Sequence, residues 1–496
     1  MEKIKLDEIT KLIKEQIKSF KNKVVQNDFG SVFSVSDNIV LIYGLNDVML
    51  NELLIFKNNI YGMVMSLNIN YVGAIVFDNN SIKEGDSVKR SNKVIEVPVG
   101  DEILGRVVNA LIQPIDNSIE INASKFRKIE NLSPKIIDHH EINEPLETGI
   151  KIIDNLIPIG KGQRELIIGD NKTGKTAIAI DTIINQKNKN VKCIYVSIGQ
   201  KNSSVLNIYQ KLEEYEAIKY TTIIDAPSDN LAFQYIAPYS AMAVAEEWAE
   251  NGDDVLIIFD DLSKHAMAYR SISLLLKRPS GREAYPGDIF YLHSRLLERS
   301  CKFKNGSITA LPIVETQMND ISSYIPTNII SITDGQIFLS SDNFNMGIKP
   351  AINIDISVSR IGSNAQFKMI KKVSKKIKTK IANYHELLAF YRFNSSIDDE
   401  TKKIINHGAV LTEIFKQDQY CPLSCAKQAI ELYAVENGYF DHVEISKLPF
   451  LIKEFHKFFE VYYRDVIDFL DKEKDLTPVV EMKLNEGIEK FFSTLM

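Results

Sequence analysis

A complete phosphate-binding loop is the feature that most constrains the fold of this chain. An apolar run, 166–168, precedes the loop, and a run with helical character, 177–180, follows it. In this context glycines let backbone N–H groups approach phosphate oxygens, the lysine reaches the terminal phosphates, and the last threonine can hold Mg²⁺. The loop therefore predicts binding of a magnesium–nucleotide, and its residues are Gly169, Asp170, Asn171, Lys172, Thr173, Gly174, Lys175 and Thr176.

The pattern around the loop predicts an α/β fold. Short β-like runs between turn residues over 24–90 indicate a small β-barrel domain. Over 91–365, strand-like runs alternate with helical segments, which is typical of a parallel-sheet P-loop nucleotide-binding domain. Over 366–496 helical spacing replaces the strand signals, so we expect a C-terminal helical domain. The expected central strands are Leu166–Ile168, Cys193–Ile198, Thr221–Ile224, Val255–Phe259 and Ser307–Leu311.

The first 23 residues are expected to form a short amphipathic helix. Its apolar positions follow helical spacing and are Ile9, Leu12, Ile13, Ile17 and Phe20. Two interpretations remain open, because such a helix can pack on its own domain or dock on a partner.

Composition excludes several classes of protein. The net charge of −6 argues against a general nucleic-acid binder, and no run approaches the ~18 apolar residues that span a bilayer. Acidic residues interrupt the N-terminal segment, which argues against a signal or transit peptide. The four cysteines form no disulfide framework, and we interpret Cys421 and Cys425 as packing residues. Adjacent His139 and His140 are interpreted as linker or surface residues.

A second element of the nucleotide site should be a carboxylate at the end of a neighbouring strand. The apolar run 255–259 leads directly to Asp260 and Asp261. We expect Asp260 to serve Mg²⁺, through water, and Asp261 to cap the following helix. The alternative is that both aspartates are caps.

Long stretches of the chain resemble the alpha chains of the rotary F-type ATP synthase family. The resemblance covers nearly the whole sequence and weakens toward its C-terminus. The matching segments are 169–186, 198–201, 237–240, 260–264, 281–288, 291–299, 324–328, 330–338, 350–353 and 357–360.

The resemblance implies a RecA-like core in a ring of six, where alpha chains alternate with catalytic beta chains around a rotating stalk. In beta chains a glutamate orients the attacking water, whereas this sequence has Gln200 at the matching position. An amide is a poor proton acceptor. The resemblance therefore implies a site that binds ATP or ADP with Mg²⁺ without turnover. The alternative is that Gln200 is an ordinary polar surface residue.

Other site residues are implied by the same resemblance. Arg360 matches the arginine finger that reaches the neighbouring beta site, although an arginine at a strand end can instead form a structural salt bridge. Lys349 stands where the family usually has arginine, and Asn171 and Lys172 replace an arginine–glutamine pair, so altered affinity is expected. The residues implied for the adenine pocket are Phe344, Pro350, Gln417 and Gln419.

The family's assembly implies several partners. We expect beta chains in an alternating ring, a gamma-type central stalk that contacts 279–288, and a delta-type peripheral stalk bound to the N-terminal helix. The complex would make ATP from ADP and phosphate with a transmembrane ion gradient, the expected ion being the proton, as an H⁺-transporting two-sector ATPase. The chain would lie peripherally on the cytoplasmic face of a bacterial inner membrane, or alternatively on the matrix face of the mitochondrial one.

Two rival functions are compatible with a P-loop ring protein. A self-sufficient catalytic ring ATPase would need a carboxylate in place of Gln200. A hexameric nucleic-acid translocase of the Rho type would need a basic and aromatic RNA-binding surface, which the acidic N-terminal region does not offer.

Overall fold

The N-terminal part of the described chain is a closed antiparallel barrel. The computed structural model describes residues 28–78, 82–116, 119–391 and 399–494, so the expected helix in 1–23 lies outside it. The strands follow the order β1-β2-β5-β4-β3-β6 around the barrel. Their bounds are β1 (Phe29–Ser36), β2 (Ile39–Gly44), β3 (Glu52–Phe56), β4 (Tyr61–Leu67), β5 (Val72–Val76) and β6 (Ser87–Val94).

Alternation along the strands fills the barrel with apolar side chains. Val40 and Ile42 on β2, and Ala74 and Val76 on β5, are fully buried in one cluster. Closing the sheet removes the free edges that would otherwise pair with other chains. β6 extends to Val94, four residues beyond the boundary expected at residue 90.

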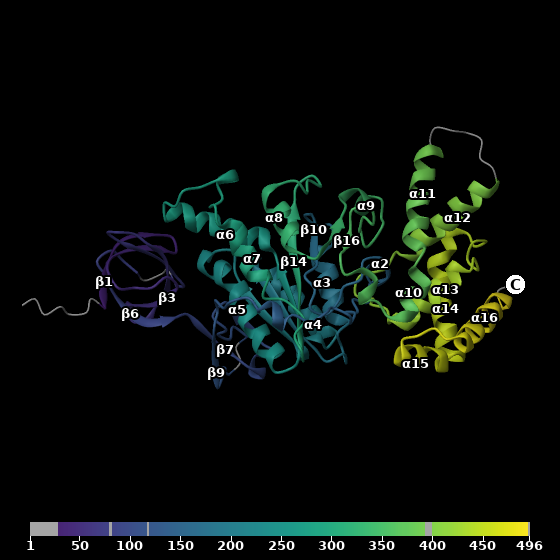
Figure 1. Cartoon of the computed structure of the whole chain (residues 1–496), viewed down its shortest axis with the longest axis horizontal. Helices are drawn as coiled ribbons and strands as arrows, with labels where there is room; N and C mark the ends of the chain where they lie inside the picture. Colours follow the sequence, from purple (N-terminus) through teal and green to yellow (C-terminus); the bar gives the residue numbers. More distant parts are fainter. Residues whose placement is uncertain (1–27, 79–81, 117–118, 392–398, 495–496) are drawn as a thin grey trace, which may run out of the picture. The chain divides into compact units, whose positions relative to one another are not determined.

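A mostly parallel sheet forms the centre of the second unit (Figure 1). Within the described residues its order is β16-β15-β10-β14-β13-β11-β12-β8, and only β16 runs antiparallel to its neighbour. The predicted fold class is therefore confirmed. The strands are β8 (Val107–Asn109), β10 (Leu166–Asp170), β11 (Val191–Ile198), β12 (Thr221–Ala226), β13 (Asp254–Asp260), β14 (Ser307–Thr316), β15 (Gly335–Leu339) and β16 (Val358–Ser359), beside a separate pair of β7 (Glu96–Val99) and β9 (Lys125–Lys128).

The register of the parallel strands gathers polar residues at one edge. Ser197 on β11 aligns with Asp260 on β13, and Asp170 on β10 aligns with Thr316 on β14. Because the carboxyl ends of these strands meet at the same edge, the loops that follow them surround one site.

Helices connect and cover the strands of this sheet. α5 is almost completely buried, and Asn230 caps its start by accepting a hydrogen bond from the Phe233 N–H at 3.0 Å. The helices of this region are α2 (Lys151–Leu156), α3 (Lys175–Ile184), α4 (Asn202–Glu214), α5 (Leu231–Glu250), α6 (Leu262–Leu275), α7 (Ile289–Leu297), α8 (Tyr324–Ile332) and α9 (Ser341–Asn345).

Two neutral histidines form a buried pair between α6 and α7. His265 Nε2 lies 3.1 Å from the Tyr235 carbonyl oxygen, so this nitrogen carries the proton and Nδ1 is the acceptor. His293 Nε2, 3.2 Å away, must then donate to His265 Nδ1. His293 Nδ1 has no hydrogen-bond partner among the described residues. Burial lowers the pKa of His265 to about 4 and that of His293 well below its usual value.

We expect this pair to destabilise the folded chain in mild acid. The folded-state pKa values lie below the unfolded value of about 6.5, so the unfolded state binds protons more tightly. Stability should be unaffected by the pair above pH 6.5 and should fall as the pH drops toward 4. For His265 the loss amounts to about 3 kcal/mol at full protonation. Thermal melting midpoints between pH 7.5 and 5 measure it.

His293→Asn should make the fall in melting midpoint shallower, because it removes one of the two groups that must be charged. His385→Asn is the matched control, since this histidine is 45% exposed. Equal slopes in all three proteins would contradict the assignment.

The C-terminal domain is helical and contains no strand among its described residues. The apolar positions expected to share one face (Met369, Ile370, Val373, Ile377 and Ile381) are all buried, but the chain breaks at 375–376 into two helices. The helices are α10 (Lys368–Ser374), α11 (Ile377–Tyr391), α12 (Asp399–Ile414), α13 (Cys425–Glu436), α14 (Leu448–Tyr462), α15 (Arg464–Glu473) and α16 (Pro478–Ser493). None of the described helices is long and apolar enough to cross a membrane.

A buried polar junction joins this helical domain to the start of the nucleotide-binding domain. Lys151 Nζ lies 2.8 Å from Glu431 Oε1, and His456 Nε2 lies 2.8 Å from Glu431 Oε2. Burial opposes ionisation of Glu431, but the two basic partners outweigh it and lower its pKa to about 2. Separating α2 from α13 would leave the buried Glu431 carboxylate without its Lys151 partner, which is strongly destabilising. The ion pair therefore holds the two helices together.

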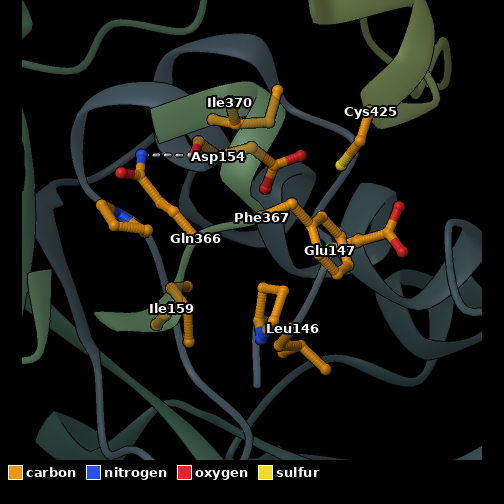
Figure 2. Close-up of a pocket in the computed structure, with 11 residues that line it drawn as sticks. Leu146, Glu147, Asp154, Ile159, Gln366, Phe367, Ile370 and Cys425 are labelled. Atoms are coloured by element: carbon orange, nitrogen blue, oxygen red, sulfur yellow. Dashed lines mark hydrogen bonds between the residues drawn. The ribbon is translucent and has the colours of Figure 1, made fainter. Parts of the chain in front are cut away.

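A small cavity beside the junction has no room for a nucleotide (Figure 2). Its volume is about 10 Å³, which is space for one water molecule. Gln366 Nε2 donates to the Asp154 carbonyl at 3.2 Å across it, and Cys425 approaches from α13. The Asp154 carboxylate accepts hydrogen bonds from Thr148 and Gln428. The cavity is therefore part of the packing between the domains.

Candidate functional site

The phosphate-binding loop lies between β10 and α3, as the sequence predicts. Gly169 is required by close packing, because a Cβ there would come within 2.5 Å of the Leu339 carbonyl oxygen. Gly174 has a φ of 104°, a left-handed conformation that favours glycine, and it directly precedes the first turn of α3. The Thr173 hydroxyl donates to the Asp170 carbonyl at 2.8 Å and closes the loop.

Lys175 is held inside the loop. Its Nζ donates to the carbonyl of Gly169 at 2.9 Å and to that of Asp170 at 2.5 Å. Burial lowers the pKa of Lys175, although nearby carboxylates, Glu315 first among them, oppose this shift. A buried cation whose hydrogen bonds within the described chain go to carbonyls is well placed to exchange them for anionic phosphate oxygens.

The Asp170 side chain anchors the loop to the neighbouring strands. Its carboxylate accepts hydrogen bonds from Thr316 Oγ1 at 2.7 Å, Ser341 Oγ at 2.8 Å and the Asn319 N–H at 2.9 Å. Burial opposes ionisation, but these bonds outweigh it and lower the pKa of Asp170. The start of the loop is thus fixed before any ligand binds.

Oxygen ligands suited to Mg²⁺ lie at the end of the loop. Thr176 Oγ1 donates to Asp260 Oδ2 at 2.7 Å, and the buried Tyr195 hydroxyl donates to the same oxygen at 2.6 Å. Asp261 accepts from the Lys264 N–H at 2.7 Å and so caps α6, while burial raises its pKa to about 7. Mg²⁺ in nucleotide sites takes few protein ligands and is completed by phosphates and water, so this donor set fits it.

Gln200 lies beside this carboxylate. It lies two residues beyond the end of β11, and its Nε2 donates to the Asp260 carbonyl at 3.2 Å. It also lines the same pocket as Thr176 and Lys175. The strand order therefore brings the amide to the edge of the sheet where the phosphates would lie.

The residues expected for the adenine end line the same pocket, which has a volume of about 680 Å³. Lys349 Nζ lies 4.9 Å from the centre of the Phe344 ring, next to Pro350. Gln419 is exposed toward the pocket, whereas the amide of Gln417 is held by backbone groups. This volume falls in the range of small-molecule sites.

Further residues of the site were not anticipated from the sequence. Tyr195, whose hydroxyl contacts Asp260, lies inside an apolar strand run. Glu315 lines the pocket and lies within β14, beyond residue 311 where we expected this strand to end. Asp181 lies on α3 beyond the recognised motif. The only available signal was helical spacing, which places Asp181 four residues after Ala177 and on the same face.

Arg360 lies apart from these residues. It follows β16, its N–H donates to the Asp334 carbonyl at 2.9 Å, and it does not line the pocket. The side chain is exposed and makes no hydrogen bond or ion pair with any described residue. The alternative of a structural salt bridge within the described chain is therefore not observed. The nearby buried Glu165 has a pKa raised by burial, which Arg360 partly offsets.

Three other features noted in the sequence are the loop 279–288, the adjacent histidines and the cysteines at 421 and 425. Asp288 at the end of the 279–288 loop accepts a hydrogen bond from the Tyr269 hydroxyl at 2.6 Å. His139 and His140 are exposed, and no cluster of three potential metal ligands occurs among the described residues. The interpretation of Cys421 as a packing residue is wrong, because it is exposed on the loop that precedes α13, whereas Cys425 is buried.

Family models match all three parts of the chain. The model described as ATP synthase alpha/beta family, nucleotide-binding domain matches residues 149–359. The C-terminal domain model of the ATP synthase alpha/beta chain matches 366–491, and the family's beta-barrel domain model matches 25–92.

Individual relatives are similar over almost their whole length. A chain from Mesoplasma florum named ATP synthase subunit alpha is 51% identical, covering 99% of this chain and 96% of the relative. Chains of the same name from Petrotoga mobilis and Clostridium acetobutylicum are 50% and 51% identical, each covering 98% of both sequences.

Proposed function

Because this chain belongs to the ATP synthase alpha/beta family, we propose that it is a non-catalytic, nucleotide-binding chain of a rotary ATP synthase head. It binds magnesium–ATP or –ADP without turnover and supplies Arg360 to the catalytic site of a neighbouring beta chain. The assembled complex makes ATP from ADP and phosphate with a transmembrane ion gradient, and the proposed ion is the proton. The family and the nucleotide-binding domain support the nucleotide and the complex.

The observation that carries the non-catalytic assignment is Gln200 beside Asp260 and Thr176. A general base contributes about 10²–10⁴ to a hydrolytic rate, and an amide cannot accept the proton of the attacking water. Lys175, Thr176 and Asp260 line the same pocket as Gln200. The pocket is therefore suited to hold a nucleotide rather than to cleave it.

The roles of the pocket residues follow from their contacts. Backbone N–H groups from Gly169 to Thr176 cradle the phosphates, and Lys175 exchanges its two carbonyl partners for phosphate oxygens. Thr176 and Asp260 would hold Mg²⁺, and the ion would supply positive charge that neutralises the phosphates. Phe344, Pro350, Gln417 and Gln419 enclose the base.

The remaining partners follow from the proposed place in the head. Beta chains alternate with this chain, a gamma-type stalk contacts 279–288, and a delta-type peripheral stalk binds the N-terminal segment 1–23. The chain lies peripherally on the membrane that houses the ion-translocating sector, at the cytoplasmic face in a bacterium. The exposed Arg360 guanidinium, which does not line its own pocket, supports a role across a subunit interface.

Introducing the missing carboxylate should create measurable turnover. Gln200→Glu places a base at the end of β11 beside Asp260. We expect phosphate release from magnesium–ATP by the purified chain to rise about tenfold or more over wild type, because a positioned base contributes about 10²–10⁴. The gain stays partial, since the isolated chain lacks a finger from a neighbour.

Gln200→Met is the matched control, because it removes the amide without adding a base and should leave the chain inactive. If Gln200→Glu folds and binds ATP but releases no more phosphate than the methionine variant, the missing base does not explain the idle site. Robust hydrolysis by the wild-type chain alone, abolished by Lys175→Ala, would instead favour a self-sufficient ATPase.

A further inference from the structure

The amide of Gln417 already makes three hydrogen bonds within the protein, and both of its N–H groups are used in them. Its Nε2 donates to the carbonyls of Gly149 at 2.8 Å and Cys421 at 2.7 Å. Its Oε1 accepts from the Lys151 N–H at 2.9 Å. Because an amide nitrogen carries two hydrogens, no donor remains for a purine. Gln417 is therefore a positioning residue that ties its loop to the start of α2.

Asp181 lies on the wall of the pocket between α3 and that loop. Ala177, Ile178 and Asp181 all line the pocket, and their spacing places them on one face of α3. Asp181 lies five residues beyond Thr176, or ~7.5 Å along the helix axis. A nucleotide whose phosphates occupy the helix N-terminus extends its base in this direction, toward Gln419 and Phe344.

Only half of the Asp181 carboxylate is used. Oδ1 accepts a hydrogen bond from the Tyr420 N–H at 2.8 Å. No described residue donates to Oδ2, although the side chain is only 8% exposed. Burial raises the pKa of Asp181 to about 7, and the single bond from Tyr420 offsets it only in part. In its ionised form the carboxylate has a free acceptor oxygen, Oδ2, which has the capacity for one more donor.

We propose that Asp181 determines a preference for adenine in this pocket, by accepting a hydrogen bond from the 6-amino group of the base through Oδ2. The inference rests on the proposed function, since a purine nucleoside triphosphate must occupy the pocket. Guanine has a carbonyl oxygen at the same position, which would place two acceptors face to face. A site built to pair one polar group discriminates strongly against an analogue that leaves it unpaired.

Asp181→Asn tests this directly. The asparagine keeps an oxygen for the Tyr420 N–H and turns an NH₂ donor toward the base, so the loop is retained while the acceptor is lost. We expect the ratio of magnesium–ATP to magnesium–GTP affinity of the full-length chain to fall about 10- to 100-fold. Asp229→Asn, which removes the same charge at an exposed position, should leave the ratio unchanged.

A folded Asp181→Asn chain with the wild-type ratio overturns the inference and leaves the proposed function standing. A wild-type chain that binds neither nucleotide overturns the proposed function, and the inference with it.

If Asp181→Asn does not fold, the base itself can be changed. Purine riboside triphosphate lacks the 6-amino group and should bind wild type about tenfold or more weakly than ATP. The same preference should persist in Gln419→Met, which removes the other amide near the base. Loss of the preference in that variant, or its absence in wild type, assigns the amine to another partner and overturns the inference.

Discussion

Replacing Arg360 by alanine in the assembled complex is expected to reduce ATP turnover by about 10³–10⁵-fold, the usual contribution of an arginine finger. The guanidinium is exposed, has no hydrogen bond or ion pair among the described residues, and does not line the pocket of its own chain. Its loss should therefore leave folding and the nucleotide affinity of this chain nearly intact. Steady-state hydrolysis by the complex, together with nucleotide binding to the isolated chain, measures both effects.

Two further variants separate the finger from simple loss of charge. Arg360→Lys keeps a positive charge but not the planar fan of donors, so it should recover only part of the rate. Arg464→Ala removes an arginine that is 80% exposed on α15 and should not change turnover. Rotary hydrolysis that is unchanged in Arg360→Ala would show that the finger assignment is wrong.

The sequence predicts the central sheet well because buried parallel strands are continuous apolar runs. All five expected strands occur in the structure, and the phosphate-binding loop follows the first of them. Ends of strands are harder to predict, because polar residues there continue the ladder while they serve the site. β14 runs to Thr316, whereas its apolar residues predicted a shorter strand. Glu315 was therefore not recognised as a residue of the site.

Long-range contacts decide the details that the sequence leaves open. The resemblance placed Gln417 in the adenine pocket, but its amide pairs with backbone groups around residue 150 and on its own loop. The hydroxyl of Tyr195 reaches Asp260 only because β11 and β13 are neighbours in the sheet. A single polar side chain on an apolar strand gives no sign of such a partner. The motifs therefore predicted where the site lies, whereas contacts such as that of Tyr195 depend on which strands are neighbours in the sheet.

Removing the loop lysine should have the second-largest effect, on binding rather than on turnover. Lys175→Ala deletes a buried cation that donates to two loop carbonyls and would otherwise reach the phosphates. A charged hydrogen bond contributes about 1.5–3 kcal/mol, so we expect the affinity of this chain for magnesium–ATP to fall about 10- to 100-fold. Turnover of the complex should change only mildly, because in the proposed function the beta sites perform the chemistry.

Lys172→Ala is the matched control, since this lysine belongs to the same loop and lines the same pocket but is exposed. Its affinity for magnesium–ATP should fall much less, because solvent screens an exposed charge and no buried carbonyl loses its donor. Titration of nucleotide binding to both variants distinguishes the effect of the buried position of Lys175 from the effect of losing one positive charge. Equal losses in the two proteins would mean that the loop attracts phosphate by overall charge alone, and the contacts of Lys175 would then carry no special weight.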